Sequence, residues 1–320
     1  MKFNISGLHH VTAIAGAPQR NLDFYAGVLG LRLVKRTVNF DDPGTYHFYF
    51  GDSIGTPGTI LTFFPWTGAF RGRQGTGQVE TTTFIIPAES ASYWQERLNG
   101  HGVAAAPPVK RFEEDVIRFA DPDGLLLELV ASQTFGNIEG WTGGTVPAEH
   151  SLRGFHSVTG ALENTAKTAK LLTEVFGYQS AGEEGNRQRF QSAVGQSPGK
   201  TIDLLTLPGT GRATSGVGSV HHIAFRAKND EEQQEWRKYL VGLGYHVSQV
   251  MDRTYFHSIY FKEPGGILFE IATDPPGFLL DESQDELGRN LKLPPDVEQV
   301  RDRIEAALEP ITIPSKETFV

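Results

Sequence analysis

Two pairs of adjacent histidines stand out in a chain of 320 residues that contains no cysteine. His9-His10 and His221-His222 each lie at the start of an apolar, strand-like run, and Glu270 lies inside the apolar run ILFEIA. Imidazole and carboxylate ligands suit iron(II), manganese(II), nickel(II) or zinc, whereas the absence of cysteine excludes disulfides and thiolate metal sites. Two histidines and one carboxylate would leave coordination positions open for substrate and dioxygen, unlike a closed structural zinc site.

Strand periodicity selects one histidine from each pair as the expected ligand. Neighbouring residues in a strand point to opposite faces, so only one histidine of each pair is expected on the open face of a sheet. His10 shares its face with Thr12, and His222 shares its face with Arg226, whereas the opposite faces are apolar. Glu270 lies between two apolar residues and is expected on the same open face. The predicted metal ligands are therefore His10, His222 and Glu270.

The first members of the pairs, His9 and His221, are expected to point away from the open face unless the strands bulge. Val11 shares the face of His9, and Ile223 shares the face of His221, so this face should pack against helices. A single strand histidine is usually a hydrogen-bonded core residue. Two pairs at equivalent repeat positions, together with a glutamate that would be costly to bury unpaired, favour a functional site instead.

Two further residues compete for the same site. His156 in GFHSV is taken to be in register with the second histidine of each pair, and Glu128 in GLLLE matches the position of Glu270. A ligand set of His156, His222 and Glu270 therefore stays open, since the residues alone offer five candidates for three positions.

The strands that must position these residues belong to four sequence repeats. Each repeat reads as a strand, a helix and three further strands, and a glycine follows the last helical turn as expected at a helix C-cap. The repeats span approximately residues 5–66, 77–132, 151–208 and 217–274. The fold class is therefore expected to be α+β.

The repeats predict a simple division of the chain. The expected parts are a first domain at residues 5–132, a linker at 133–150, a second domain at 151–274 and a tail at 275–320. The tail is expected to contain a helix, because four apolar residues share helical spacing: Val297, Val300, Ile304 and Leu308.

Composition excludes several classes of function. Hydrophobic residues make up 39% of the chain, which allows a sizeable core, and the net charge of −9 argues against nucleic acid or an anionic membrane as a partner. The sequence has no apolar run of membrane-spanning length and no signal-peptide region at its start, so a cytoplasmic protein is expected. The glycine-containing segments GTPGT and GTGRATSG lack the ending of a phosphate-binding loop and are expected to be turns.

Several motifs together resemble one enzyme family. LHHVT, LVKRT, GTPGT, GFHS, EEGNR, HHIAF and YFHSIY followed by PGGILFE are similar to the hydroquinone-type ring-cleaving dioxygenases of the vicinal oxygen chelate superfamily. The resemblance covers nearly all of the chain and implies four βαβββ modules that form two vicinal oxygen chelate domains with half-open barrel sheets. It also implies that the first and fourth modules pair around one iron(II), with His10, His222 and Glu270 as ligands and manganese(II) as an alternative ion.

The same resemblance implies roles for other residues. Tyr260 lies ten residues before Glu270, so it is expected on the adjacent antiparallel strand, with a hydroxyl available for catalysis. His9 and His221 match catalytic positions, and Thr12 and Arg253 match substrate-binding positions, of that branch.

The implied reaction is oxidative cleavage of a hydroquinone or catechol ring, in aromatic catabolism or quinone detoxification. The expected partners are a small aromatic diol and dioxygen, with no nucleic acid and no membrane, and homo-oligomer formation is left open. Two other functions are compatible with the scaffold. One is a glyoxalase-type isomerase, which would need a second carboxylate ligand such as Glu128. The other is a sequestration protein that binds a small molecule without turnover.

Overall fold

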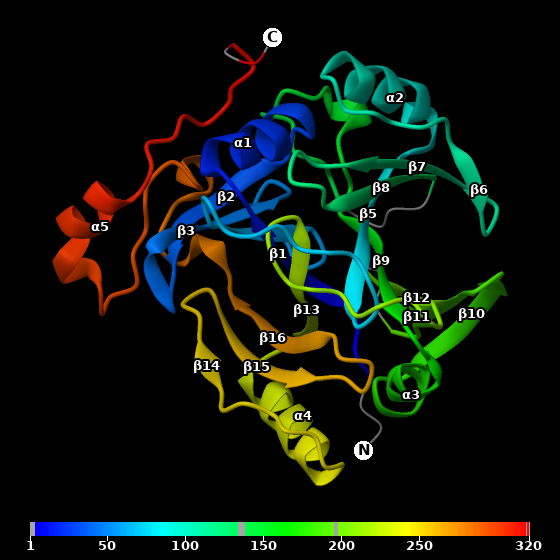
Figure 1. Cartoon of the computed structure of the whole chain (residues 1–320). Helices are drawn as coiled ribbons and strands as arrows, with labels where there is room; N and C mark the ends of the chain where they lie inside the picture. The colour runs from blue at the N-terminus through cyan, green and yellow to red at the C-terminus, as the bar shows by residue number, and fades with distance from the viewer. Residues whose placement is uncertain (1–3, 134–137, 195–197, 318, 320) are drawn as a thin grey trace.

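The computed structural model describes residues 4–133, 138–194, 198–317 and 319, and it contains the four expected modules (Figure 1). The first module consists of β1 (Leu8–Ala15), α1 (Pro18–Leu22), β2 (Arg32–Asn39), β3 (Asp42–Gly51) and β4 (Ile60–Pro65). The second consists of β5 (Gln78–Pro87), α2 (Ala91–Gly100), β6 (Val109–Arg111), β7 (Glu114–Ala120) and β8 (Leu126–Ser132).

The second half of the chain repeats this order. The third module consists of β9 (Phe155–Leu162), α3 (Ala166–Lys170), β10 (Tyr178–Glu184), β11 (Arg187–Ser192) and β12 (Thr201–Thr206). The fourth consists of β13 (Ser219–Ala227), α4 (Asp230–Gly242), β14 (Met251–Asp252), β15 (Phe256–Lys262) and β16 (Leu268–Pro276). Helices α1 and α3 continue into π-helical segments at Asp23–Val28 and Leu171–Val175. Short 3-10 helices lie at Ala88–Ser90, Ala148–His150, Phe278–Leu280, Gln284–Glu286 and Glu298–Val300.

Within the described residues, the strands form two eight-stranded sheets, each curled into a half-open barrel, which confirms the predicted α+β fold. One sheet has the order β14-β15-β16-β13-β1-β4-β3-β2 and joins the fourth module to the first. The other has the order β10-β11-β12-β9-β5-β8-β7-β6 and joins the third module to the second. Each sheet therefore takes one module from each predicted half, so the ranges 5–132 and 151–274 divide the sequence but are not the units that build the sheets.

The pairing across the halves forms two antiparallel seams. Strand β1 pairs with β13, and β5 pairs with β9. The segments that connect the modules within each half also run beside one another and form isolated bridges, such as Arg71 with Val217 and Thr76 with Arg212. Each seam gives hydrogen-bond partners to backbone groups that would otherwise be unpaired at a strand edge.

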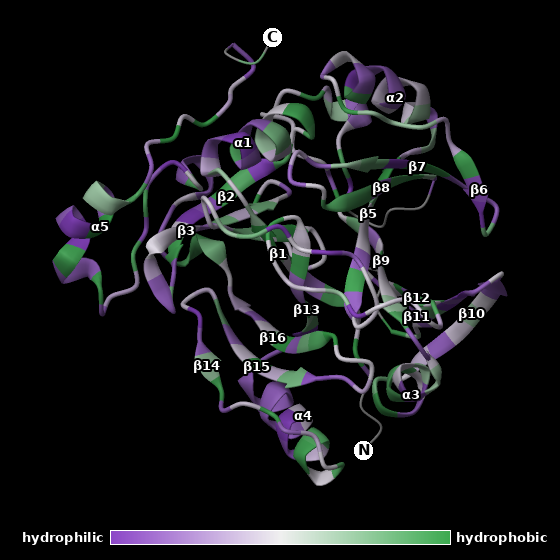
Figure 2. Ribbon diagram, viewed as in Figure 1, coloured by the Kyte–Doolittle hydropathy of each residue, from purple (hydrophilic) through white to green (hydrophobic). Residues whose placement is uncertain are grey.

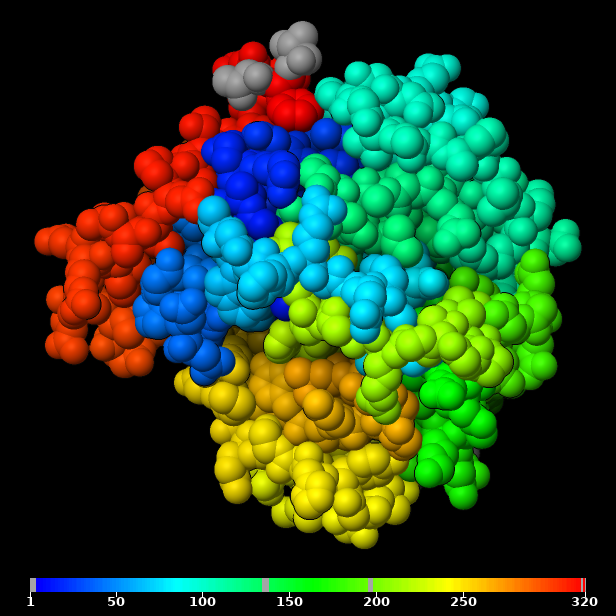
Figure 3. All heavy atoms as spheres, in the orientation of Figure 1, coloured from blue at the N-terminus to red at the C-terminus, as the bar shows by residue number. Residues whose placement is uncertain are grey.

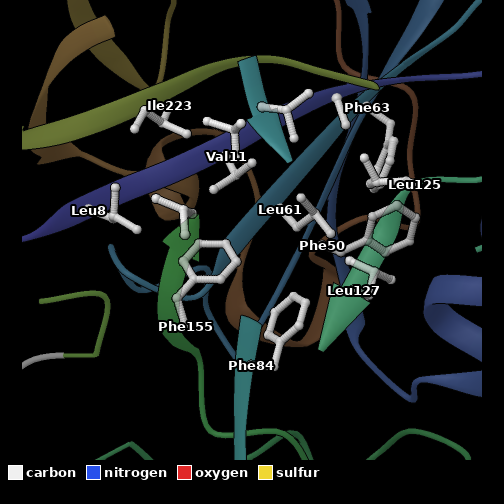
Figure 4. Close-up of a cluster of buried hydrophobic side chains, with 14 of the residues drawn as sticks. Leu8, Val11, Phe50, Leu61, Phe63, Phe84, Leu125, Leu127, Phe155 and Ile223 are labelled. Carbon is white, nitrogen blue, oxygen red and sulfur yellow. The ribbon is translucent and has the colours of Figure 1, made fainter. Parts of the chain in front are cut away.

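The apolar faces of the two sheets meet in one continuous core. Val11 of β1 and Ile223 of β13 are buried together with Phe84 of β5 and Phe155 of β9 (Figure 4). Burying each such side chain stabilises the fold by roughly 1.5–3 kcal/mol. This face was expected to pack on helices, but it also packs on the second sheet, which leaves the opposite face of β1 and β13 free to line a cavity.

Helix α4 shows how the outer surface is covered. Its sequence is largely hydrophilic (Figure 2), but Gln233, Trp236 and Leu240 are buried on its inner side. Asn229 caps its start by accepting a hydrogen bond from the Glu232 amide.

The tail lies along the outer edge of the first module (Figures 1 and 3). Leu291 forms a parallel bridge with Arg36 of β2, and the Tyr46 hydroxyl of β3 donates to the Glu309 carbonyl. The tail helix α5 (Arg301–Ala307) is shorter than the apolar spacing suggested. Of the predicted linker, residues 134–137 lie outside the described part of the chain, and Val146 is buried in the core. Among the described helices, none is long and apolar enough to cross a membrane.

Candidate metal centre

Three potential metal ligands converge on one point at the seam between the fourth and first modules. His10 on β1, His222 on β13 and Glu270 on β16 each offer a ligand atom, and these atoms all lie within 4.8 Å of one another. Glu270 Oε2 lies 2.8 Å from His222 Nε2 and 3.3 Å from His10 Nε2, and the two Nε2 atoms are 3.3 Å apart. Within the described residues, no other group of three such side chains converges in this way.

Neighbouring strands bring these residues together. Strand β13 lies between β1 and β16, so the seam places all three side chains on adjacent strands. In the register, Thr12 pairs with His222, and Ala224 pairs with both His10 and Glu270. The small side chain of Ala224 thus lies between the two ligand strands and leaves room for an ion.

Electrostatics suit a divalent cation. Burial alone would raise the pKa of Glu270, but His10 and His222 hold it well below its usual value. Burial lowers the pKa of His222, so its imidazole is neutral at neutral pH. Glu270 Oε1 accepts a hydrogen bond from the Ser258 hydroxyl, whereas the buried Oε2 makes no hydrogen bond in the described structure. An ionised oxygen that lacks a hydrogen-bond donor, facing two imidazole nitrogens, is the donor set that fits a metal ion.

A bulge in β1 places His9 beside His10. Leu8 pairs with Phe225 and His10 pairs with Ala224, so His9 is an extra residue without a partner on β13. This bulge is the exception that the sequence prediction for His9 allowed for, because strict alternation does not hold across a bulge. His9 Nδ1 lies 2.9 Å from His10 Nδ1. Burial, followed by the charge of His10, lowers the pKa of His9 well below its usual value.

A matching bulge in β13 places His221 beside His222. Thr12 pairs with His222 and Ala13 pairs with Val220, so His221 is the extra residue. His221 Nδ1 lies 2.8 Å from His222 Nδ1. Burial, followed by the charge of His222, lowers the pKa of His221 to about 4. Unlike His9, His221 is exposed and lines the cavity next to the ligands.

A cavity of about 440 Å³ opens beside the ligands. Its volume lies in the range that is usual for small-molecule sites. Its lining combines aromatic side chains with polar ones, and it includes Thr12, His221, Arg253 and Tyr260 from the residues singled out in the sequence, whereas His9 lies behind the wall. The aromatic members are Tyr49, Phe64, Trp66, Phe256 and Tyr260 together with Phe40 near the opening, where Asp41 is exposed.

Tyr260 lies directly opposite Glu270 in the antiparallel pairing of β15 and β16, as its spacing predicts. Burial and then the charge of Glu270 raise the pKa of Tyr260 far above its usual value, so its hydroxyl keeps its proton. The Arg253 guanidinium lies over the Tyr260 ring, 5.8 Å from its centre, and forms an ion pair at 3.3 Å with Asp41. Arg253 is therefore a partner of Tyr260 and not a free surface charge.

A hydrogen-bonded chain in the cavity wall was not predicted from the sequence. The Tyr49 hydroxyl lies 2.9 Å from His47 Nδ1, His47 Nε2 lies 2.9 Å from Thr62 Oγ1, and Thr62 donates to Thr12 Oγ1 at 2.9 Å. Burial, with smaller electrostatic contributions from the neighbouring ligand histidines, lowers the pKa of His47 well below its usual value. The signal that was available is the pattern HFY in β3, which puts His47 and Tyr49 on one face.

The alternative ligand His156 lies in the second sheet, one residue out of the assumed register. Phe84 pairs with Phe155 and Thr83 pairs with Ser157, so His156 is a bulged residue that corresponds to His9. Ser157 thus occupies the position of His10. His156 Nε2 lies 2.9 Å from Glu114 Oε1, and no set of His156, His222 and Glu270 forms.

Glu128 corresponds to Glu270 in strand position, but it forms ion pairs with arginines. Its carboxylate accepts two hydrogen bonds from Arg111, at 2.7 and 3.0 Å, and lies 3.2 Å from Arg118 Nε. In this sheet Thr81 occupies the position of His222. Arginines and hydroxyl-bearing residues thus replace the histidines, and the second barrel holds an ion-pair network where the first holds potential metal ligands.

Comparison with known proteins adds independent evidence. The model of the Glyoxalase/Bleomycin resistance protein/Dioxygenase superfamily matches residues 7–129 and 154–271. The chain is 49% identical over 307 residues to MhqO of Bacillus subtilis (strain 168), provisionally named a ring-cleaving dioxygenase, covering 96% of this chain and 97% of MhqO. It is 36% identical over 318 residues to the chlorohydroquinone/hydroquinone 1,2-dioxygenase of Sphingobium indicum, covering 97% and 98% of the two chains. A crystal structure of a provisionally named dioxygenase from Bacillus subtilis superimposes with a TM-score of 0.93 at 48% identity, covering 98% of this chain and 99% of that one.

Proposed function

Because the chain belongs to the Glyoxalase/Bleomycin resistance protein/Dioxygenase superfamily, we propose that it is an iron(II)-dependent dioxygenase that opens the ring of a hydroquinone or catechol with O2. The observation that carries the proposal is the buried set of His10, His222 and Glu270 beside an aromatic-lined cavity. Aromatic catabolism or quinone detoxification is the physiological setting that fits this chemistry. Manganese(II) is the alternative ion, since the ligand types suit both.

The donor set leaves coordination positions free for the reactants. When bound, iron(II) would accept a substrate oxygen and dioxygen side by side and would carry electrons from the ring to oxygen. Glu270, whose ionised form is favoured, would supply the one negative charge among the ligands, so a bound divalent ion would keep a net positive charge that favours a deprotonated diol.

Tyr260 is the proposed proton donor. Its hydroxyl stays protonated, lines the cavity and lies on the strand next to Glu270. Arg253 packs over the Tyr260 ring, is itself held by Asp41, and is proposed to keep the phenol in place. A positioned acid of this kind assists the cleavage of a bond to oxygen in the transition state.

Hydroxyl and imidazole groups on the opposite wall are proposed to orient the substrate. Because Thr62 donates its proton to Thr12, the hydroxyl proton of Thr12 is available to an oxygen in the cavity. His221 offers its Nε2 at the same wall. Phe64, Trp66 and Phe256 provide apolar faces on which an aromatic ring can pack.

The two alternative functions have less support. A glyoxalase-type isomerase would need a second carboxylate ligand, but Glu128 belongs to the other sheet and is bound by arginines. A sequestration protein would not need a buried set of three ligands with open coordination positions next to its cavity.

Oxygen uptake tests the proposal directly. The protein is loaded anaerobically with iron(II), mixed with hydroquinone or catechol, and exposed to 18O2. We expect one O2 consumed for each diol lost, with both labelled atoms in the ring-opened product. Tight diol binding without oxygen uptake would support sequestration, and oxygen-independent turnover of a hemithioacetal would support the isomerase; either result would overturn the proposal.

A further inference from the structure

The two histidine pairs share the same internal contact, but their bulged residues differ in exposure. In each pair the Nδ1 atoms of the bulged residue and of the ligand lie within 3 Å, at 2.9 Å for His9 with His10 and at 2.8 Å for His221 with His222. His9 is 2% exposed, whereas His221 is exposed to the cavity.

The short contact between the two buried rings couples the positions of their protons. A neutral imidazole carries one N–H, so one of the two Nδ1 atoms donates and the other accepts. A metal bound between His10, His222 and Glu270 would be held by Nε2 of His10, because this atom faces the other two ligands.

This contact matters for the ligand His10. In the tautomer that binds a metal through Nε2, His10 carries its proton on Nδ1 and donates it to Nδ1 of His9. Its Nε2 then has a free lone pair, and this is the atom that faces Glu270 and His222. Only this tautomer of His10 can bind a metal through Nε2.

We propose that His9 is a positioning residue that fixes the metal-binding tautomer and the ring orientation of His10 by accepting its Nδ1–H. The inference rests on the proposed function only in that His10, His222 and Glu270 bind a metal. Groups behind the ligands orient metal-binding histidines in this way, and losing such a partner typically costs 10–100-fold in metal affinity. Phe256 supports the arrangement, because its ring packs at 5.0 Å from both His9 and His10.

The second pair supplies a matched control within the same chain. His221 stands in the same relation to His222, but the cavity gives water access to it. Water can replace a lost acceptor at an exposed position, whereas the Nδ1–H of His10 would stay unpaired if His9 were removed. The equivalent substitution at the two positions should therefore have unequal effects on metal binding.

The test measures affinity for Co2+ alone, by competition with a coloured chelator and from the visible absorption bands of the bound ion. His9→Leu keeps the apolar volume and removes the acceptor, and we expect Co2+ binding to weaken by about 10–100-fold. His9→Asn keeps an acceptor at the Nδ1 position and should return the affinity to within about threefold of the unaltered protein, and His221→Leu should lose less than His9→Leu. Chemical unfolding of the apo proteins distinguishes a specific loss of metal affinity from a general loss of folding stability.

Two results would overturn the inference: His9→Leu binding Co2+ as well as the unaltered protein, or His9→Asn binding as weakly as His9→Leu. Should His9→Leu fail to fold, 15N spectra of the histidines in the unaltered apo protein decide, since the inference requires the proton of His10 on Nδ1. Co2+ binding without any oxygen uptake on diols would overturn the proposed reaction and leave this inference standing.

Discussion

Tyr260 and Glu270 face one another across the antiparallel pair β15 and β16. The negative carboxylate and the buried position both oppose ionisation of the phenol, and the carboxylate also belongs to the ligand set. The pairing thus keeps a proton donor beside the place where substrate and dioxygen would meet. A substitution at Tyr260 should therefore affect catalysis without affecting metal binding, because Tyr260 is not one of the converging ligands.

Tyr260→Phe should reduce kcat by roughly 100-fold or more, because it removes a positioned acid and leaves the ligands in place. Iron content and the affinity for the diol should change little. Steady-state oxygen uptake and metal analysis of the same sample check this prediction. An unchanged kcat would exclude Tyr260 as the donor.

His10→Ala should lose the metal, whereas His156→Ala should keep both metal and activity. His10 supplies one of three converging ligand atoms, and His156 is hydrogen-bonded to Glu114 in the other sheet. We expect binding of iron(II) to weaken by more than about 100-fold in His10→Ala, since losing a ligand exceeds the loss of its outer partner. Anaerobic metal titration measures both variants, and metal loss in His156→Ala alone would move the site to the second barrel.

His47→Phe should lower both the free energy of unfolding and kcat, and it should leave metal binding unchanged. The change leaves the buried hydroxyls of Thr62 and Tyr49 without their partner, which costs about 1–3 kcal/mol of unfolding free energy. Urea unfolding and oxygen uptake measure the two effects. Tyr49→Phe is the matched control, because it shortens the chain by one hydroxyl and keeps His47 bonded to Thr62; it should retain more activity than His47→Phe.

We expect the free energy of unfolding to depend on pH through Asp121, which is not one of the potential metal ligands. Burial raises its pKa to about 6, even though it accepts hydrogen bonds from Tyr25 and from the amides of Asp123 and Leu125. A carboxyl whose pKa is raised by folding stabilises the fold fully below its unfolded pKa, and this stabilisation is lost as pH rises through about 6.

Asp121→Asn should therefore flatten the fall in unfolding free energy between about pH 4 and 6, and should be more stable than the unaltered protein above that range. The neutral amide keeps an oxygen for the two backbone amides. Chemical unfolding of both proteins across this pH range is the measurement. A parallel pH dependence in the two would show that Asp121 is not the group responsible.

Much of this architecture could be predicted from the sequence, because the information is local. Four repeats of strand, helix and three strands follow from periodicity and glycine positions, and the second histidine of each pair follows from alternation. Tyr260 was placed beside Glu270 by counting residues along a hairpin. These features depend on neighbours that lie close in the chain.

What could not be predicted depends on strand pairing. Whether His9 and His221 turn toward or away from the ligands is decided by bulges, which exist only relative to the partner strand. For the same reason, the predicted register of His156 is wrong by one residue. Its motif GFHSVT aligns with GLHHVT so that Ser157, and not His156, matches His10. His47 was missed because it sits among ordinary aromatic strand residues, and only the fold shows that it faces Thr62 across β4.

The seam between the first and fourth modules also determines when the site can exist during synthesis. His10 and His222 are separated by 212 positions, and the pair of the second and third modules is nested inside this span. The inner sheet can close as soon as the third module leaves the ribosome, whereas β1 must wait for β13 and β16. The ligand set is therefore completed last, so a chain that stops before the fourth module retains only one of the three ligands.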